Sequence, residues 1–176
     1  RDDRMYEGLN NKMFVHATFH SPEFRRAFAV TFPDVYGHGG QVTRRELVDL
    51  TGFPITSTLM GLGAYPASGK NWLGMLGMHG TYEANMAMHD CDVMLCIGAR
   101  FDDRITGRTD AFSPGSKKIH IDIDPSSINK NIRVDIPIIG DAANVMGDLL
   151  QVFKAEAKKP DIKAWWNQIA QWKARN

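Results

Sequence analysis

Short apolar runs alternate with amphipathic segments along most of the chain from about residue 41 onward. The apolar runs are rich in Ile, Val and Leu, and they predict strands at 53–60, 92–98, 117–124 and 135–141. Apolar side chains at helical spacing predict helices at 43–52, 80–91, 142–157 and 162–176. This alternation of strands and helices favours an α/β fold in which helices cover a parallel sheet.

Capping signals mark the ends of two of these helices. Thr43 and Glu46 have the spacing of a capping box, and Gly52 follows as a typical stop signal. Asp141 directly precedes the predicted helix at 142–157, where its carboxylate can accept hydrogen bonds from the first amide groups.

The first 38 residues lack a sustained pattern, and only 27–32 resembles a strand. We therefore expect three parts: an irregular segment 1–38, a central α/β domain 39–157, and a linker with a helix at 158–176.

The closing helix carries Trp165, Ile169 and Trp172 at i, i+4 and i+7, which places them on one face. The sequence does not identify what covers this face. We expect it to be a packing face, yet one that leaves residues 160–176 poorly anchored and prone to self-association.

The balance of charge limits the possible partners. The 21 basic and 20 acidic side chains nearly cancel, which leaves a formal net charge of +1. We expect no nucleic-acid or anionic membrane partner, because no strong positive field would attract one. No apolar stretch approaches the ~20 residues of a membrane span, and the charged start lacks the apolar core of a signal peptide. A cytoplasmic protein is expected.

Neither the cysteines nor the paired histidines predict a metal site. Cys91 and Cys96 lack zinc-type spacing and are expected to be reduced core residues. His16 and His20 are four residues apart, but no third ligand is evident. The methionines are expected to fill the core, although some could line an apolar pocket for a flat ring; they are Met60, Met75, Met78, Met86, Met88 and Met94.

Polar clusters follow the predicted strands. In open parallel sheets, ligands bind beyond the carboxyl ends of the strands. Arg100 and Arg104 lie in such a loop and could hold a diphosphate, because a guanidinium matches phosphate oxygens in shape and charge. The alternative is a solvated loop in which Asp102 and Asp103 pair with these arginines.

Two further loops have a binding and a structural interpretation. Gly77 and Gly80 surround His79 just before a predicted helix, where amide groups favour an anion, but the histidine could equally cap or pack. Asp122 and Asp124 end a strand as ribose-binding acids do in dinucleotide folds, although Asp124 could instead cap a turn. No Ser-His-Asp or Cys-His arrangement is visible, so these residues predict a nucleotide-type binding domain without catalytic side chains.

The motifs "GMLGMHGTYEAN", "GARFDDR" and "HIDIDP", with the sequence around them from about residue 44 to 155, closely resemble the central domain of the acetolactate synthase (acetohydroxyacid synthase) large-subunit family. The resemblance implies a doubly wound, six-stranded parallel sheet that binds FAD in a structural role. It implies that the full enzyme, a transferase, condenses two pyruvates, or pyruvate and 2-oxobutyrate, toward branched-chain amino acids. Thiamine diphosphate and Mg²⁺ would be bound in domains that this chain does not carry. A homodimer and a small regulatory subunit are the implied partners.

The resemblance also implies which residues lie at the FAD site. No catalytic residue and no metal ligand carries over. The expected FAD-binding residues are Gly39, Gly40, Thr58, Leu59, Met60, Met78, His79, Gly80, Gly98, Ala99, Arg100, Asp102, Arg104, Asp122, Ile123 and Asp141.

The sequence departs from the family pattern in two places. The segment before Arg44 does not resemble the family, and its glycine loop keeps only Gly39 and Gly40. The thiamine-binding GDG motif is absent, so we expect the isolated chain to be inactive. The alternative hypothesis is a non-catalytic nucleotide-binding or interaction domain that binds a partner through its tryptophan face.

Overall fold

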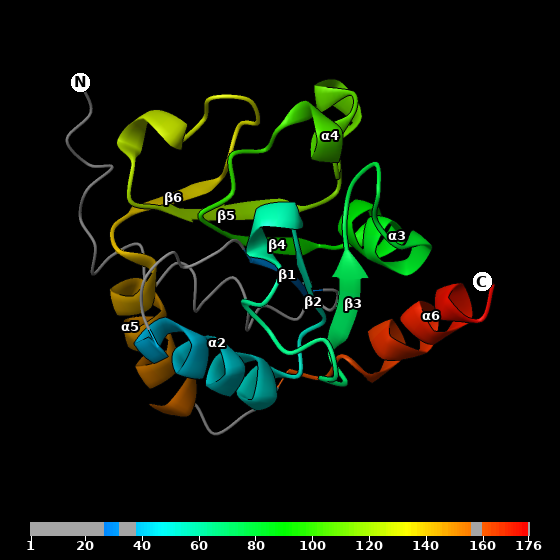
Figure 1. Ribbon diagram of the computed structural model, residues 1–176, viewed down its shortest axis with the longest axis horizontal. Helices are drawn as coiled ribbons and strands as arrows, with labels where there is room; N and C mark the ends of the chain where they lie inside the picture. The colour runs from blue at the N-terminus through cyan, green and yellow to red at the C-terminus, as the bar shows by residue number, and fades with distance from the viewer. Residues whose placement is uncertain (1–26, 32–37, 156–159, 176) are drawn as a thin grey trace.

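The computed structural model describes residues 27–31, 38–155 and 160–175, which form one parallel sheet with helices on both of its faces (Figure 1). The sheet has six strands in the order β3-β2-β1-β4-β5-β6. Their bounds are Ala27–Thr31 for β1, Ile55–Ser57 for β2, Trp72–Met75 for β3, Val93–Ile97 for β4, Lys117–Asp122 for β5 and Ile136–Ile139 for β6. Every neighbouring pair is parallel.

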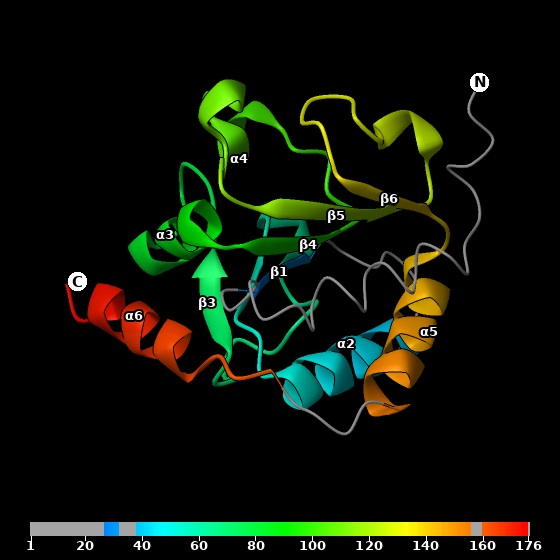
Figure 2. The ribbon, with the colours of Figure 1, turned by 180° about the vertical axis from the view of Figure 1, so that it is seen from behind.

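The helices lie on opposite sides of this sheet. Helices α2 and α5 pack side by side below it in both ribbon views, whereas the short α4 lies above it (Figure 2). Helix α6 packs against α3. The helices span His38–Thr51 for α2, Tyr82–Asp90 for α3, Asp103–Thr106 for α4, Ala142–Ala155 for α5 and Lys163–Lys173 for α6. Short 3-10 turns occupy Leu59–Gly61, Thr109–Ala111 and Pro125–Ser127.

The strand order identifies the doubly wound fold that the resemblance implied. From β1 the chain builds outward through β2 and β3, then crosses back to place β4 on the other side of β1. The order therefore reverses between β1 and β4, and in this fold the crevice beyond the carboxyl ends of those two strands is the usual ligand site. The predicted strand at 27–32 is confirmed as β1, which occupies this central position.

The central strands are buried on both faces. All five residues of β4 and the last five of β5 are buried, as expected for parallel strands covered by helices on both sides. The strand predictions at 92–98, 117–124 and 135–141 are confirmed with shorter bounds.

The start of the first predicted helix was wrong. Helix α2 begins at His38, so Thr43 lies inside it and does not begin a capping box. Gly39 and Gly40 likewise lie in its first turn and not in a loop before it. Two glycines cost a helix only about 1 kcal/mol each, which packing can offset. The predicted end was right, because Gly52 has a φ of +73° and its amide donates to the carbonyl of Val48.

The structure also differs from the predicted elements around β2 and β3. The predicted strand at 53–60 ends at Ser57, and a 3-10 turn occupies residues 59–61. The strand β3 was missed, because its sequence WLGM contains a glycine and lies between glycine-rich segments.

The closing helix is firmly packed, which corrects the expectation of a poorly anchored segment. Trp165, Ile169 and Trp172 are 2%, 0% and 5% exposed and belong to the main hydrophobic core. Trp166 adds a hydrogen bond from its indole nitrogen to the carbonyl of Gly52 at 2.9 Å. The partner of this apolar face is therefore the α/β core of the same chain.

The remaining local predictions are settled where the structure describes the residues. Asp141 caps α5, since its Oδ1 accepts a hydrogen bond from the amide of Asn144 at 3.0 Å. Cys91 and Cys96 are free and buried, as predicted. His16 and His20 lie outside the described residues. None of the helices within the described ranges is long and apolar enough to cross a membrane.

Candidate functional site

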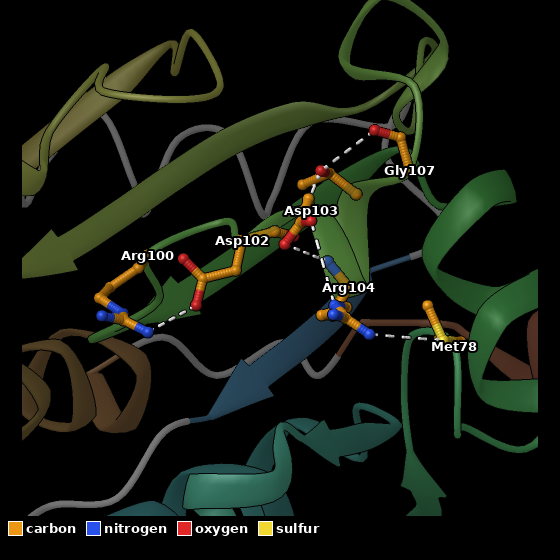
Figure 3. Close-up of polar contacts among 7 residues, drawn as sticks. Met78, Arg100, Asp102, Asp103, Arg104 and Gly107 are labelled. Atoms are coloured by element: carbon orange, nitrogen blue, oxygen red, sulfur yellow. Dashed lines mark hydrogen bonds and ion pairs between the residues drawn. The ribbon is translucent and has the colours of Figure 1, made fainter.

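The candidate site is the edge of the sheet at which its parallel strands end. The loops that leave β2, β3, β4 and β5 all begin at this edge because the strands share one direction. The loop after β4 carries Arg100, Asp102, Asp103 and Arg104 and begins beside β1, where the strand order reverses (Figure 3). The predicted residues from different loops are thus brought to one edge.

Arg100 forms an ion pair on this edge. Its Nη2 lies 2.6 Å from Oδ2 of Asp102, and the two side chains are 70% and 42% exposed. Its backbone carbonyl accepts a hydrogen bond from Nδ2 of Asn131 at 2.9 Å, which holds the loop against the segment after β5. The pairing proposed as an alternative is therefore present, but a pair this exposed contributes little free energy and leaves most of the guanidinium accessible.

Arg104 has weaker contacts than Arg100. Its Nη1 lies 3.9 Å from the sulfur of Met78, and its Nε lies 4.0 Å from Oδ2 of Asp103 (Figure 3). The side chain is 71% exposed. The Asp103 carboxylate instead accepts the Arg104 backbone amide at 2.9 Å, so the guanidinium is available to an anion.

The glycine loop before α3 is packed against the loop that carries Arg104. Gly77 has a φ of +91°, and a Cβ there would lie 2.5 Å from the carbonyl oxygen of Arg104. A Cβ on Gly80 would lie 2.5 Å from the carbonyl oxygen of Met75. Only glycine fits at these two positions, and the exposed Met78 and His79 between them are carried on a tightly folded turn.

The two carboxylates at the end of β5, Asp122 and Asp124, have different surroundings. Asp122 is largely buried, its Oδ1 accepts the amide of Asp124 at 2.9 Å, and its Oδ2 lies 3.6 Å from Nε2 of His120. Burial lowers the pKa of His120 more than Asp122 raises it, so the ring is neutral near pH 7. Asp122 Oδ2 thus lacks a charged partner among the described residues.

Asp124 adopts the structural role that was the alternative for it. Its carboxylate accepts hydrogen bonds from the hydroxyl and the amide of Ser126 at 2.8 and 2.9 Å. These bonds lower the pKa of Asp124. It caps the short turn after β5.

Large apolar side chains are exposed on the same edge. Leu59 and Met60 follow β2, Met78 follows β3 and Ile123 follows β5, and each is more than 60% exposed. Met60 and Met78 therefore do not fill the core, which leaves the alternative of lining an apolar surface, whereas Met88 and Met94 are core residues as expected. Apolar surface next to cations suits a ligand with a flat ring and phosphate groups. Sequence reasoning missed Leu62, which lies further along the connection after β2 and is 53% exposed.

The other predicted site residues lie at the edge with different accessibility. Gly98, with a φ of +69°, turns the chain out of β4. Thr58 and Ala99 are buried, and the hydroxyl of Thr58 has no hydrogen-bond partner within the described part of the chain. The exposed Asp141 follows β6 and is engaged in capping α5.

A separate hollow of about 460 Å³ lies between α2 and the β2–β3 connection. Its lining includes Arg45, Leu62, Tyr65 and Trp72, and the two rings stack at 6.4 Å. Arg100 and Arg104 do not line it. Across the described ranges, no group of three or more His, Cys, Asp or Glu residues is placed to hold a metal ion.

Comparisons with known proteins agree with the fold and the motifs. Residues 35–149 match the family model of the thiamine pyrophosphate enzyme, central domain. The chain is 46% identical over 171 residues to the acetolactate synthase isozyme 3 large subunit of Escherichia coli, and this match covers 90% of this chain and 30% of that protein. It is 50% identical over 151 residues to the acetolactate synthase large subunit of Haemophilus influenzae, covering 81% of this chain and 26% of that protein. The chain thus spans less than a third of the length of these curated relatives.

Proposed function

Because this chain belongs to the thiamine pyrophosphate enzyme family, of which it contains the central domain, we propose that it is the FAD-binding part of an acetolactate synthase large subunit. The proposed ligand position is the carboxyl edge of the sheet, with the diphosphate between the loops that follow β3 and β4. The flavin has a structural role here and is not a redox reactant.

The observation that carries the proposal is the accessibility of Arg100 and Arg104. Both follow β4 at the point where the strand order reverses, and both side chains are at least 70% exposed. A diphosphate offers oxygens to two guanidinium groups, and such charge-assisted contacts are stronger than neutral hydrogen bonds. The weak contacts of Arg104 mean that little is lost when it turns to a phosphate.

The neighbouring groups suit the remaining parts of the ligand. Asp122 Oδ2 can accept a ribose hydroxyl, as acidic strand ends do in dinucleotide-binding folds. The exposed Leu59, Met60 and Met78 offer apolar surface to a flat ring system. These features together fit a dinucleotide better than a simple anion.

The activity of the whole protein belongs to the same proposal. The full enzyme condenses two pyruvates, or pyruvate and 2-oxobutyrate, in branched-chain amino acid biosynthesis. Thiamine diphosphate and Mg²⁺ supply the carbanion chemistry there, in domains outside this chain. A second large subunit and a small regulatory subunit are the proposed partners.

Binding of FAD by the 176-residue chain tests the proposal. The chain is titrated into FAD while flavin fluorescence is followed, and the same titration is repeated with riboflavin, which has the ring but no phosphate. We expect saturable binding of FAD and at least 10-fold weaker binding of riboflavin, because the two arginine contacts are missing. Equal affinity for both ligands, or no binding of FAD, contradicts the proposal.

The part of the chain that the structure describes does not favour the alternative of an interaction domain that binds a partner through its tryptophan face. That alternative needs an exposed tryptophan face to contact a partner, but Trp165 and Trp172 are buried in the core of this chain.

A further inference from the structure

Asn85 on helix α3 holds the backbone of Gly77 through both ends of its carboxamide. Its Oδ1 accepts the Gly77 amide hydrogen at 2.8 Å, and its Nδ2 donates to the Gly77 carbonyl at 3.0 Å. Because the two hydrogen bonds engage the peptide groups before and after Gly77, they fix the backbone on both sides of this residue. In the sequence, Asn85 is visible only as the last residue of the motif GMLGMHGTYEAN.

Gly77 and Met78 connect this contact to Arg104. Gly77 approaches the Arg104 carbonyl so closely that a Cβ would lie 2.5 Å from it. The next residue, Met78, donates its amide hydrogen to the same carbonyl at 2.8 Å, and its sulfur lies 3.9 Å from Nη1 of Arg104 (Figure 3). A continuous set of contacts therefore runs from Asn85 through the glycine loop to the arginine.

Helix α3 gives Asn85 a rigid support. Thr81 caps the helix by accepting the amide of Ala84 at 3.2 Å, and its hydroxyl donates to the carbonyl of Leu73 at 2.6 Å. Ala84 and Ala87, on either side of Asn85 in the sequence, are fully buried. A shift of the glycine loop would thus have to break contacts with a packed helix.

We propose that Asn85 is a positioning residue that fixes the backbone of Arg104, and thereby the point from which its guanidinium reaches the diphosphate site. Asn85 acts through Gly77 and Met78 and does not itself touch the ligand. The inference rests on the proposed binding of FAD at this edge. It predicts that Asn85 and Arg104 contribute to FAD affinity as one unit, because neighbouring residues in one network are not additive.

Asn71 provides a matched control at the opposite edge of the sheet. It is a buried asparagine that also holds backbone, since its Nδ2 donates to the carbonyl of Phe53 at 2.9 Å. It precedes β3, at the amino ends of the strands. Asn71→Ala should destabilise the fold without changing the FAD affinity of the folded chain.

The test is a double-mutant cycle on the full 176-residue chain. FAD dissociation constants are measured for wild type, Asn85→Ala, Arg104→Ala, the double variant and Asn71→Ala, each below its melting temperature. We expect Asn85→Ala to weaken binding about 10-fold in the wild-type background and less than about 3-fold in Arg104→Ala. An equal effect in both backgrounds, or no effect in the folded single variant, overturns the inference. If the alanine variant does not fold, Asn85→Asp takes its place. Aspartate keeps the side-chain volume, but its carboxylate cannot donate a hydrogen bond to the Gly77 carbonyl.

A second measurement separates this inference from the proposed function. Amide hydrogen exchange of Met78 reports its hydrogen bond to Arg104 without any ligand. We expect Asn85→Ala to accelerate exchange at Met78 at least 10-fold while the amides of β4 keep their wild-type rates. Failure of wild type to bind FAD contradicts the proposed function, whereas unchanged exchange at Met78 overturns the coupling itself.

Discussion

The indole nitrogen of Trp166 donates a hydrogen bond to the carbonyl of Gly52 at 2.9 Å, across 114 residues of sequence. Gly52 ends helix α2, and Trp166 lies in α6, the closing helix. The contact ties the last helix of the chain to the first helix that the structure describes. Helix α6 is thus an integral part of the domain core.

This contact leads to a prediction on stability. Trp166→Phe should cost about 1 kcal/mol, because it removes one hydrogen bond but keeps most of the ring packing. Trp172→Ala should cost about 3–5 kcal/mol, because it leaves a large cavity in the core. Urea unfolding followed by circular dichroism measures both. Gln171→Ala, on the exposed side of the same helix, is the control and should stay within about 0.5 kcal/mol of wild type.

A second prediction concerns the acid side of the stability curve. Burial lowers the pKa of His120, so the unfolded chain takes up a proton near pH 6.5 that the folded chain resists. Stability is therefore full above about pH 6.5 and falls as the pH drops toward the lowered pKa of the folded state. His120→Gln should flatten the curve in this window. Asp124, whose pKa is also lowered, contributes only below about pH 4, so the two effects are separable. A slope between pH 7 and 5 that is identical in the variant would rule this origin out.

A third prediction concerns the two thiols. Burial raises the pKa of Cys91 to about 12 and that of Cys96 well above its ordinary value. The reactive thiolate is therefore scarce in the folded chain, and access to both side chains is blocked. We expect no alkylation by iodoacetamide at pH 8 in native buffer and modification of both residues in urea. Mass spectrometry distinguishes the two states, and rapid modification of either thiol in native buffer would contradict the packing described for them.

The sequence predicted the parts of the fold where burial leaves a simple pattern. Strands β4 and β5 are buried on both faces, so their apolar runs were visible without any neighbour. The start of α2 was hidden because Gly39 and Gly40, which usually interrupt helices, lie in its first turn. Trp172 was expected to lie on a packing face, but the surface that covers it could not be predicted, because an apolar helix face does not reveal its partner.

The sequence predicted the charged residues of the candidate site better than the residues that surround and hold them. Arg100 and Arg104 stood out because two arginines follow a buried strand. From the residues alone, Met60 and Met78 could either fill the core or line an apolar surface, because an apolar residue at a strand end looks the same whether it is buried or exposed. Asn85 was part of the motif GMLGMHGTYEAN, but its role could not be predicted, since it depends on contact with a glycine loop eight residues away.

A fourth prediction concerns the arginines that are proposed to meet the diphosphate. Arg100→Ala and Arg104→Ala should each weaken FAD binding by about 10- to 150-fold, because each removes a charge-assisted contact. Arg100→Lys should restore only part of the affinity, since an ammonium group lacks the bidentate fork. Asp122→Asn should weaken binding less, because an amide oxygen still accepts one hydroxyl hydrogen bond. Flavin fluorescence beside a thermal melt separates lost affinity from lost stability. Equal FAD affinity of wild type and both folded alanine variants would show that this loop does not hold the diphosphate.

Asp102 makes this test sharper, because it already pairs with Arg100 at 2.6 Å. If Asp102 only competes with the diphosphate for Arg100, Asp102→Asn removes both the competitor and a repulsive charge. FAD binding should then tighten by up to about fivefold, which corresponds to the free energy of an exposed ion pair. Asp110→Asn is the control, because Asp110 pairs with Arg108 at the same 2.6 Å and is also exposed. That variant should leave the affinity unchanged. A loss of affinity in Asp102→Asn would instead mean that Asp102 contacts the ligand directly, and that the pair with Arg100 is part of the binding geometry.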